Sequence, residues 1–193
     1  MVRPREFQED KALEKAMHLF WAKGYEATSL SDLTSSMGIQ KPSIYAAFGD
    51  KKDLFEAALR KYIHEHASFI RRQLQSVSSA KEAIRSLFEE ITRQSYEDDR
   101  NRGCFCINTM VELAPHEPRF EVLTREHQLY LSVIFLETIE RGKKSGEFQP
   151  GVNAKALANT LVVSLIGLTV MMKSRPDRGF VNQSVETILS LLD

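Results

Sequence analysis

The sequence contains few of the residues that mark turn-rich, disulfide-bonded or membrane-spanning proteins. Nine glycines and six prolines in 193 residues are too few for the closely spaced turns of a β-sandwich. Two cysteines and the lack of an apolar segment behind the basic N-terminus predict a cytoplasmic protein with reduced thiols and no signal peptide. The longest uncharged run, 156–172, is shorter than the roughly 20 residues of a membrane span. We therefore expect this run to form a buried helix and expect no membrane partner.

An excess of charge of one sign is also absent. Lysine and arginine together number 26, aspartate and glutamate also 26, and the first 51 residues are balanced in the same way. Net charge therefore gives no indication of nucleic acid as a partner. The sequence lacks the G-x-S-x-G, P-loop, H-E-x-x-H and dinucleotide-binding patterns of common enzymes. We expect no enzymatic activity, no cofactor and no metal site, since Cys104 and Cys106 alone are a poor ligand set.

Helical periodicity is present along the whole chain and predicts an all-α fold of about nine helices. Caps and breakers delimit them: Gly24, Gly38 and Gly49 end helices, Ser29 and Asp50 begin them, and Pro42 suits a first turn. The expected helices are 7–23, a short one from Ser29 to Gly38, another from Pro42 to Phe48, then 51–75, 80–97, 103–113, 118–145, 153–175 and 179–192. We predict a DNA-binding domain over 1–50 and a ligand-binding and dimerisation domain over 51–193.

The two short helices between Leu30 and Phe48 have the pattern of a helix-turn-helix. Leu33 and Met37 face inward from the first helix, Ile44 faces inward from the second, and Gly38 lies in the turn. In such a unit the second helix enters the major groove of DNA. The same geometry also occurs in helical proteins that bind no DNA, so the pattern leaves both possibilities open.

The outer surface of the second short helix is polar and suits contact with a nucleic acid. Lys41 can reach a phosphate or a guanine edge. Ser43 and Tyr45 can donate hydrogen bonds to phosphate oxygens. Lys51, at the start of the next helix, is a further candidate for a phosphate contact. These groups favour DNA binding over plain helical packing.

The segments 24–33 (GYEATSLSDL) and 37–55 (MGIQKPSIYAAFGDKKDLF) resemble the N-terminal domain of the tetracycline-repressor (TetR) family, over about residues 6–58. The resemblance implies a three-helix DNA-binding domain, a long connecting helix, and a homodimer that binds a palindromic operator as a repressor. The DNA contacts that it implies are Thr28, Ser29, Gln40, Lys41, Pro42, Ser43, Tyr45 and Lys51. The sequence departs from the family at Ala46-Ala47, where a large aromatic or histidine is common. Arg3 and Arg5 are candidates for an N-terminal arm on the DNA.

The last two helices have the composition of a dimer interface. Two such helices from each subunit would form a four-helix bundle. The alternative is that their apolar residues pack within one subunit. The residues concerned are Leu157, Leu161, Leu165, Leu168, Met172, Val181, Val185, Ile188, Leu189 and Leu192.

The segment 102–113 is the most unusual part of the second half. Its Gly-Cys start resembles a subset of TetR-like regulators, in some of which the matching cysteine reacts with electrophiles or oxidants. Cys104 lies near a helix N-terminus, and Arg100 and Arg102 precede it, so we expect a lowered thiol pKa. The alternative is a cysteine that packs as a small apolar side chain.

A small-molecule effector between helices is the other expected trigger. Glu112 and His127 deserve the first test, because a polar group in an apolar pocket needs a partner. We expect His64 and His66 at the surface. The candidate ligand-binding residues are Cys104, Met110, Glu112, His127, Tyr130, Leu168 and Met171. The leading hypothesis is a ligand-responsive dimeric repressor; a thiol-triggered repressor, a helical enzyme and a helical adaptor are the alternatives.

Overall fold

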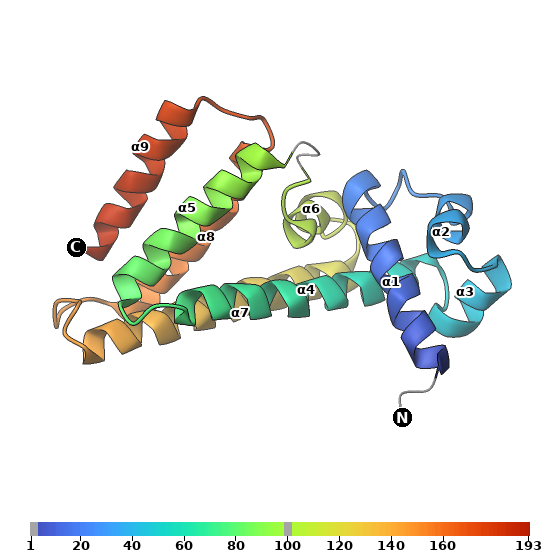
Figure 1. The fold of residues 1–193 in the computed structure, drawn as a ribbon, viewed down its shortest axis with the longest axis horizontal. Coiled ribbons are helices and arrows are strands. Elements are labelled where there is room, and N and C mark those ends of the chain that lie inside the picture. Colours follow the sequence, from blue (N-terminus) through green and yellow to red (C-terminus); the bar gives the residue numbers. More distant parts are fainter. Residues whose placement is uncertain (1–3, 99–101) are drawn as a thin grey trace. The chain divides into compact units, whose positions relative to one another are not determined.

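A computed structural model describes the backbone of residues 4–98 and 102–193, with side chains from residue 9 onward in those ranges. Within them every regular element is a helix and there is no strand (Figure 1). The predicted all-α fold is confirmed. Its elements are α1 (Pro4–Lys23), α2 (Leu30–Met37), α3 (Lys41–Phe48), α4 (Lys51–Gln75), α5 (Ala80–Glu97), α6 (Phe105–Glu112), α7 (Pro118–Lys144), α8 (Ala154–Met172), α9 (Arg178–Leu189) and a 3₁₀ turn (Ser190–Leu192).

Local signals set the ends of the short helices. Ser29 and Asp32 form a capping box at the start of α2, in which each side chain accepts from the other residue's backbone N–H. Gly38 ends α2 in the left-handed region, with φ 73°, which glycine adopts without steric strain. Pro42 lies in the first turn of α3. The predicted arm residues, Arg3 and the side chain of Arg5, lie outside the described part of the chain.

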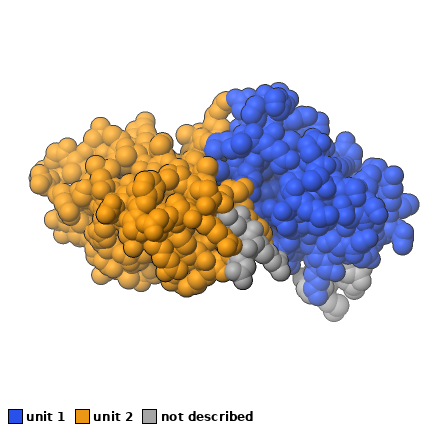
Figure 2. Space-filling model, turned by 90° about the horizontal axis from the view of Figure 1, so that it is seen from above, with its two compact units in different colours: residues 1–65, 104–124 blue, residues 66–103, 125–193 orange. Residues whose placement is uncertain are grey.

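The chain packs as two compact units (Figure 2). Unit 1 comprises residues 1–65 and 104–124, and unit 2 comprises 66–103 and 125–193. Unit 1 therefore contains α6 and the first turns of α7 in addition to the helix-turn-helix. The predicted functional division after residue 50 differs from this packing division, because α4 continues without a break from Lys51 to Gln75. The functional boundary stays a prediction.

Aromatic residues from four helices form the centre of unit 1. The ring of Phe55, on α4, contacts the rings of Phe20, Phe105 and Phe120 edge-on, with centroid distances of 4.9, 5.2 and 5.2 Å. All four side chains are buried. Edge-to-face contacts of this kind add to the free energy gained from burying the rings. They hold α1, α6 and the start of α7 against α4.

Unit 2 has its own apolar core, to which α5, α7, α8 and α9 contribute. The prediction for the last two helices needs correction here, since most of the apolar residues assigned to a dimer interface are buried inside the unit: Leu161, Leu165, Leu168, Met172, Val181, Val185, Leu189 and Leu192. An apolar face exposed in the isolated chain remains on α8, with Val163, Gly167 and Val170 at its centre. By length and composition alone, α8 is also the one described helix that could cross a membrane.

Candidate nucleic-acid interface

The helix-turn-helix buries one side and exposes the other. Leu33 and Met37 of α2 and Ile44 of α3 are buried, so the predicted inner face is confirmed. The outer face of α3 exposes Tyr45, 44% accessible, together with the other residues assigned to DNA: Gln40, Lys41, Pro42 and Ser43. Ala46 and Ala47 are exposed beside them. The helix therefore presents a slim, polar side to solvent.

The lysines around this face divide into neutralised and unneutralised groups. Lys23 pairs with Asp32 at 3.0 Å, and Lys52 pairs with Glu117 at 2.6 Å. Hydrogen bonding to Glu117 raises the pKa of Lys52. Among the described side chains, no carboxylate forms an ion pair with Lys41, and the same holds for Lys51. Lys41 and Lys51, both predicted from the sequence, therefore keep ammonium groups that no carboxylate in the described part of the chain neutralises.

Thr28 and Ser29, at the start of α2, have different environments. Ser29 is exposed and caps the helix, where a phosphate would also meet free N–H groups. Thr28 is fully buried, and its hydroxyl donates to the carbonyl of Gly24 over 2.6 Å. The prediction that the Thr28 side chain contacts DNA is therefore wrong, because that hydroxyl is used inside the turn.

Lys51 lies over an aromatic ring of the same unit. Its Nζ is 4.2 Å from the centroid of the Tyr25 ring, within the range of a cation–π contact. The Tyr25 ring packs edge-on against Phe55 at 5.2 Å. Tyr25 thus fixes the position of a predicted phosphate-binding lysine, a role that the sequence motif did not reveal.

Glu112, predicted to line a ligand pocket, is used differently. Its Oε1 accepts from the backbone N–H of Tyr25 at 3.0 Å and of Glu26 at 3.2 Å. These amides lie in the turn between α1 and α2. The prediction of Glu112 as an effector ligand needs correction, because its carboxylate is bound to the DNA-binding half of unit 1. No local sequence pattern predicts the hydrogen bond between Glu112 and Tyr25, because the two residues are 87 positions apart.

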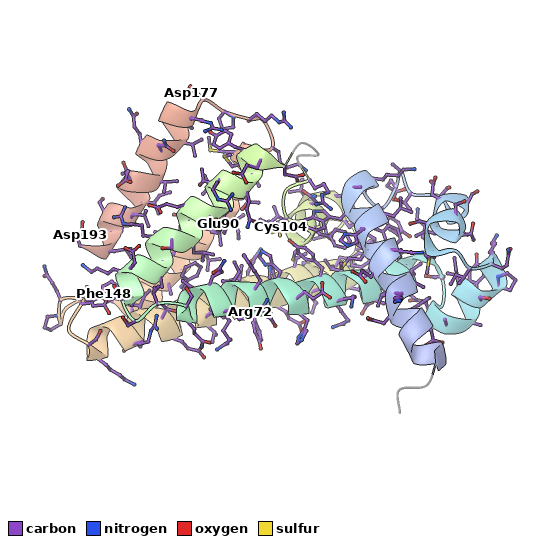
Figure 3. The ribbon with its side chains drawn as sticks, viewed as in Figure 1. Arg72, Glu90, Cys104, Phe148, Asp177 and Asp193 are labelled. Carbon is purple, nitrogen blue, oxygen red and sulfur yellow. The ribbon has the colours of Figure 1, made fainter. Side chains whose placement is uncertain are left out.

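Cys104 occupies the N-cap position of α6 (Figure 3) and is buried. Tyr62 donates a hydrogen bond from its hydroxyl to the Cys104 sulfur over 3.2 Å. Burial raises the pKa of the Cys104 thiol, although this hydrogen bond opposes the rise. The expectation of a lowered pKa is therefore wrong: desolvation outweighs the favourable contacts. Arg100, one of the two expected causes, lies outside the described residues.

Among the described side chains of unit 2, His127 has two ring nitrogens that are both buried and unpaired. It is buried, and neither ring nitrogen has a hydrogen-bond partner in the described part of the chain. Its ring contacts that of His66 at a centroid distance of 5.2 Å. Burial lowers the pKa of His66 to about 4 and that of His127 to about 3, so both are uncharged at neutral pH. His66 is partly buried rather than exposed as expected, whereas His64 is exposed.

The remaining candidate ligand residues differ in burial and belong to different units. Tyr130 and Met171 are 56% and 44% exposed, and Leu168 packs in the core of unit 2. Met110 is half-buried on α6. Cys104, Met110 and Glu112 belong to unit 1, and the other four to unit 2. Within the described ranges, no three His, Cys, Asp or Glu side chains lie close enough to hold a metal ion.

Comparison with known proteins agrees with this architecture. Residues 12–58 match the family described as bacterial regulatory proteins, tetR family, and residues 80–188 match the tetracyclin repressor-like C-terminal domain. The chain is 33% identical to the uncharacterized HTH-type transcriptional regulator YezE of Bacillus subtilis, over 100% of both chains. It is 31% identical to the HTH-type transcriptional repressor ComR of Escherichia coli, over 98% of this chain and 90% of that one.

A solved structure of comparable identity was determined with DNA. A cysteine-substituted form of the TetR family regulator CifR, complexed with 26bp double-strand operator DNA, is 34% identical with a TM-score of 0.84. The alignment covers 97% of this chain and 98% of that one. The chain therefore belongs to the TetR family. It is a transcriptional regulator with a helix-turn-helix DNA-binding domain, and its relatives are regulators rather than enzymes.

Proposed function

We propose that this regulator is a repressor that binds a palindromic operator as a homodimer and releases it when a small molecule binds the second domain. One observation carries the DNA-binding part: the exposed polar face of α3, beside which Lys41 and Lys51 lack a carboxylate partner in the described part of the chain. ComR, matched over nearly the whole chain, is named a repressor, which supports repression here. The proposed contacts are Ser29, Gln40, Lys41, Pro42, Ser43, Tyr45 and Lys51.

The test of DNA binding uses a duplex selected by the wild-type protein from a random-sequence pool. Lys41→Ala and Tyr45→Ala should weaken binding to this duplex and leave the far-ultraviolet circular dichroism unchanged. Lys51→Ala should weaken binding to all DNA sequences similarly. It should also make the salt dependence of binding shallower, by an amount equivalent to about one phosphate contact. Lys144→Ala, an exposed lysine at the end of α7, is the matched control. Equal affinity of the four variants and wild type would contradict the proposed interface.

A homodimer follows from the palindrome, because two recognition helices must lie about 34–36 Å apart, one turn of DNA, or somewhat more. The exposed face of α8 supports it, since Val163, Gly167 and Val170 leave an uncharged, small-residue strip on the surface of the isolated chain. Packing this strip against a second copy would form the core of a four-helix bundle with α9. Because its proposed partner is operator DNA, the regulator would function in the cytoplasm.

His127 is the observation that favours a small-molecule effector. A buried imidazole without partners loses about 1–3 kcal/mol relative to its hydrated state, and a bound polar group would recover part of that. An uncharged imidazole offers one donor and one acceptor, which suits a neutral effector with a hydroxyl or carbonyl group. The effector must bind better to the conformation that releases DNA.

The effector test compares compounds retained by the purified protein. Mass spectrometry of extracts should find a small molecule in wild type that is lost from His127→Phe. Adding that compound should lower the affinity of wild type for the selected duplex and leave the variant unaffected. Identical extracts from both proteins would argue against His127 as the binding group.

Thiol modification at Cys104 is the second candidate trigger. The observation that favours it is the position of Cys104 at one end of α6, whose other end, Glu112, contacts the α1–α2 turn. N-Ethylmaleimide should then release the selected duplex from wild type and Cys106→Ser but not from Cys104→Ser. Release that persists in Cys104→Ser would show that the thiol is idle.

A further inference from the structure

The turn between α1 and α2 presents two backbone N–H groups in one direction. Gly24 follows α1 in the left-handed region, with φ 83°, and the amides of Tyr25 and Glu26 come directly after it. Successive N–H groups next to a left-handed residue form a concave site for an anion. In this protein the Glu112 carboxylate occupies that site, with Oε1 shared between the two amides.

Gly24 allows the carboxylate to come this close. A Cβ atom built at this position would lie 3.0 Å from Oε2 and 3.1 Å from Oε1 of Glu112. These distances are shorter than most real Cβ contacts, so a side chain here would require the Glu112 carboxylate to shift by a few tenths of an ångström. The absence of a side chain at residue 24 and the two hydrogen bonds are separate observations that support the same contact.

We propose that Glu112 is a positioning residue for operator binding: by holding the Tyr25 and Glu26 amides, it holds the Tyr25 ring beneath Lys51 and sets the start of α2. The Tyr25 backbone is bound by Glu112, and its ring contacts the Lys51 ammonium at 4.2 Å. The same turn is closed by the hydrogen bond from Thr28 to the Gly24 carbonyl, immediately before the cap residue Ser29. A shift of α6 that withdraws Glu112 would therefore free the Tyr25 ring and release Lys51 from its predicted phosphate contact.

This inference rests on the proposed DNA-binding function and names Glu112 as the residue through which a movement of α6 would change DNA affinity. Salt-controlled affinity for the selected duplex is measured for wild type, Glu112→Ala, Glu112→Gln and Lys51→Ala. Glu112→Ala should weaken binding about tenfold, within the usual range of coupling between separate sites. Its salt slope should fall by about one, as in Lys51→Ala, because Lys51 is no longer placed. Glu112→Gln should rescue most of the affinity, since its carbonyl oxygen can accept both N–H bonds.

Two further measurements separate positioning from general stability. The double variant Glu112→Ala/Lys51→Ala should bind little worse than Lys51→Ala, because both changes remove one contact. In NMR spectra, the Tyr25 and Glu26 amide protons should move upfield in Glu112→Ala and much less in Glu112→Gln. Glu126→Ala, an exposed glutamate on α7, serves as the matched control and should behave as wild type in each assay.

The outcomes distinguish the two proposals. If wild type binds the selected duplex and Glu112→Ala binds it equally well with the same salt slope, the positioning role is overturned and the DNA-binding function stands. Additive losses in the double variant would also overturn it. If Glu112→Ala does not fold, the test uses Glu112→Gln. Its Tyr25 and Glu26 amide proton shifts should stay close to the wild-type values, and large changes with wild-type DNA affinity would overturn the positioning role. A wild-type protein that selects no duplex overturns both proposals.

Discussion

The hydroxyl of Tyr62 donates a hydrogen bond to the sulfur of Cys104 over 3.2 Å, inside the core of unit 1. Burial raises the pKa of Tyr62 well above its usual value, so the phenol keeps its proton and remains the donor. Burial also raises the pKa of Cys104, so the sulfur is a protonated thiol at neutral pH. The pair joins α4 to the start of α6, and the burial around it keeps the Cys104 thiol unreactive at rest.

The first prediction concerns the reactivity of this thiol. In a Cys106→Ala background, alkylation of native Cys104 by iodoacetamide should be slow at pH 7 and should still be rising at pH 9. Tyr62→Phe should slow it further at every pH, because a hydrogen bond to sulfur favours the thiolate. Rates are measured by mass spectrometry, with the free energy of unfolding as the control for a loosened core. Fast alkylation at pH 7 in a fully folded protein would contradict the raised pKa.

The second prediction concerns Gly24 and uses Gly38 as its control. Both adopt left-handed conformations, but a Cβ at Gly38 would meet nothing within 4 Å. Gly38→Ala should therefore lower the free energy of unfolding only by the left-handed strain, about 1–2 kcal/mol. Gly24→Ala should lower it by more, because the added methyl group displaces the Glu112 carboxylate. Urea unfolding of both variants measures the difference.

The same pair of glycines can be compared after Glu112 is removed. In a Glu112→Ala background, the destabilisation by Gly24→Ala should fall to that of Gly38→Ala, since the clashing group is gone. If Gly24→Ala still lowered the free energy of unfolding more than Gly38→Ala in this background, the difference would have a cause other than Glu112.

The third prediction concerns the acid side of the stability profile. In the unfolded chain His66 and His127 have the usual histidine pKa of 6.5. In the folded protein the pKa of His66 is about 4 and that of His127 is about 3. The unfolded state therefore holds more protons below pH 6.5, and stability is lost as the pH falls. Each histidine contributes up to about 1.4 kcal/mol per pH unit to this loss.

Urea unfolding between pH 6.5 and pH 5 measures this slope before the carboxylates titrate. His127→Phe should make the fall in unfolding free energy with pH shallower by roughly one proton. A wild-type profile that is flat over this range would mean that the histidines are hydrated in solution.

The fourth prediction concerns the uncharged face of α8. Val163 is 70% exposed in the isolated chain, and Val163→Glu should convert the dimer to monomer in light scattering, because an unpaired charge is expensive to bury. Binding to the selected duplex should fall strongly, while the helical content stays unchanged. Val111→Glu, at a similarly exposed valine on α6, should remain dimeric and bind DNA. A dimeric Val163→Glu would place the interface elsewhere.

Local features of the sequence determined where the helices lie and what the second of the short pair presents. The capping box of Ser29, the left-handed Gly38 and the first-turn Pro42 act within one turn of chain, so their effect follows from their order alone. The periodic apolar residues Leu33 and Ile44 likewise specify the inner face of the helix-turn-helix. These local signals predict the fold and the exposed polar side of α3. The family resemblance predicts that this side contacts DNA.

The tertiary structure decided what each polar group contacts. Whether Glu112 meets a ligand or the Tyr25 amide depends on segments 87 positions apart in sequence. Thr28 bonds to a carbonyl only four positions away, but its complete burial follows from the packing around the turn. The direction of the Cys104 pKa depends on burial, which neighbouring residues do not report. On α8, apolar residues surround the helix, so periodicity cannot tell the core of one subunit from an interface between two. Only packing in three dimensions separates Leu165 inside the unit from Val163 outside it.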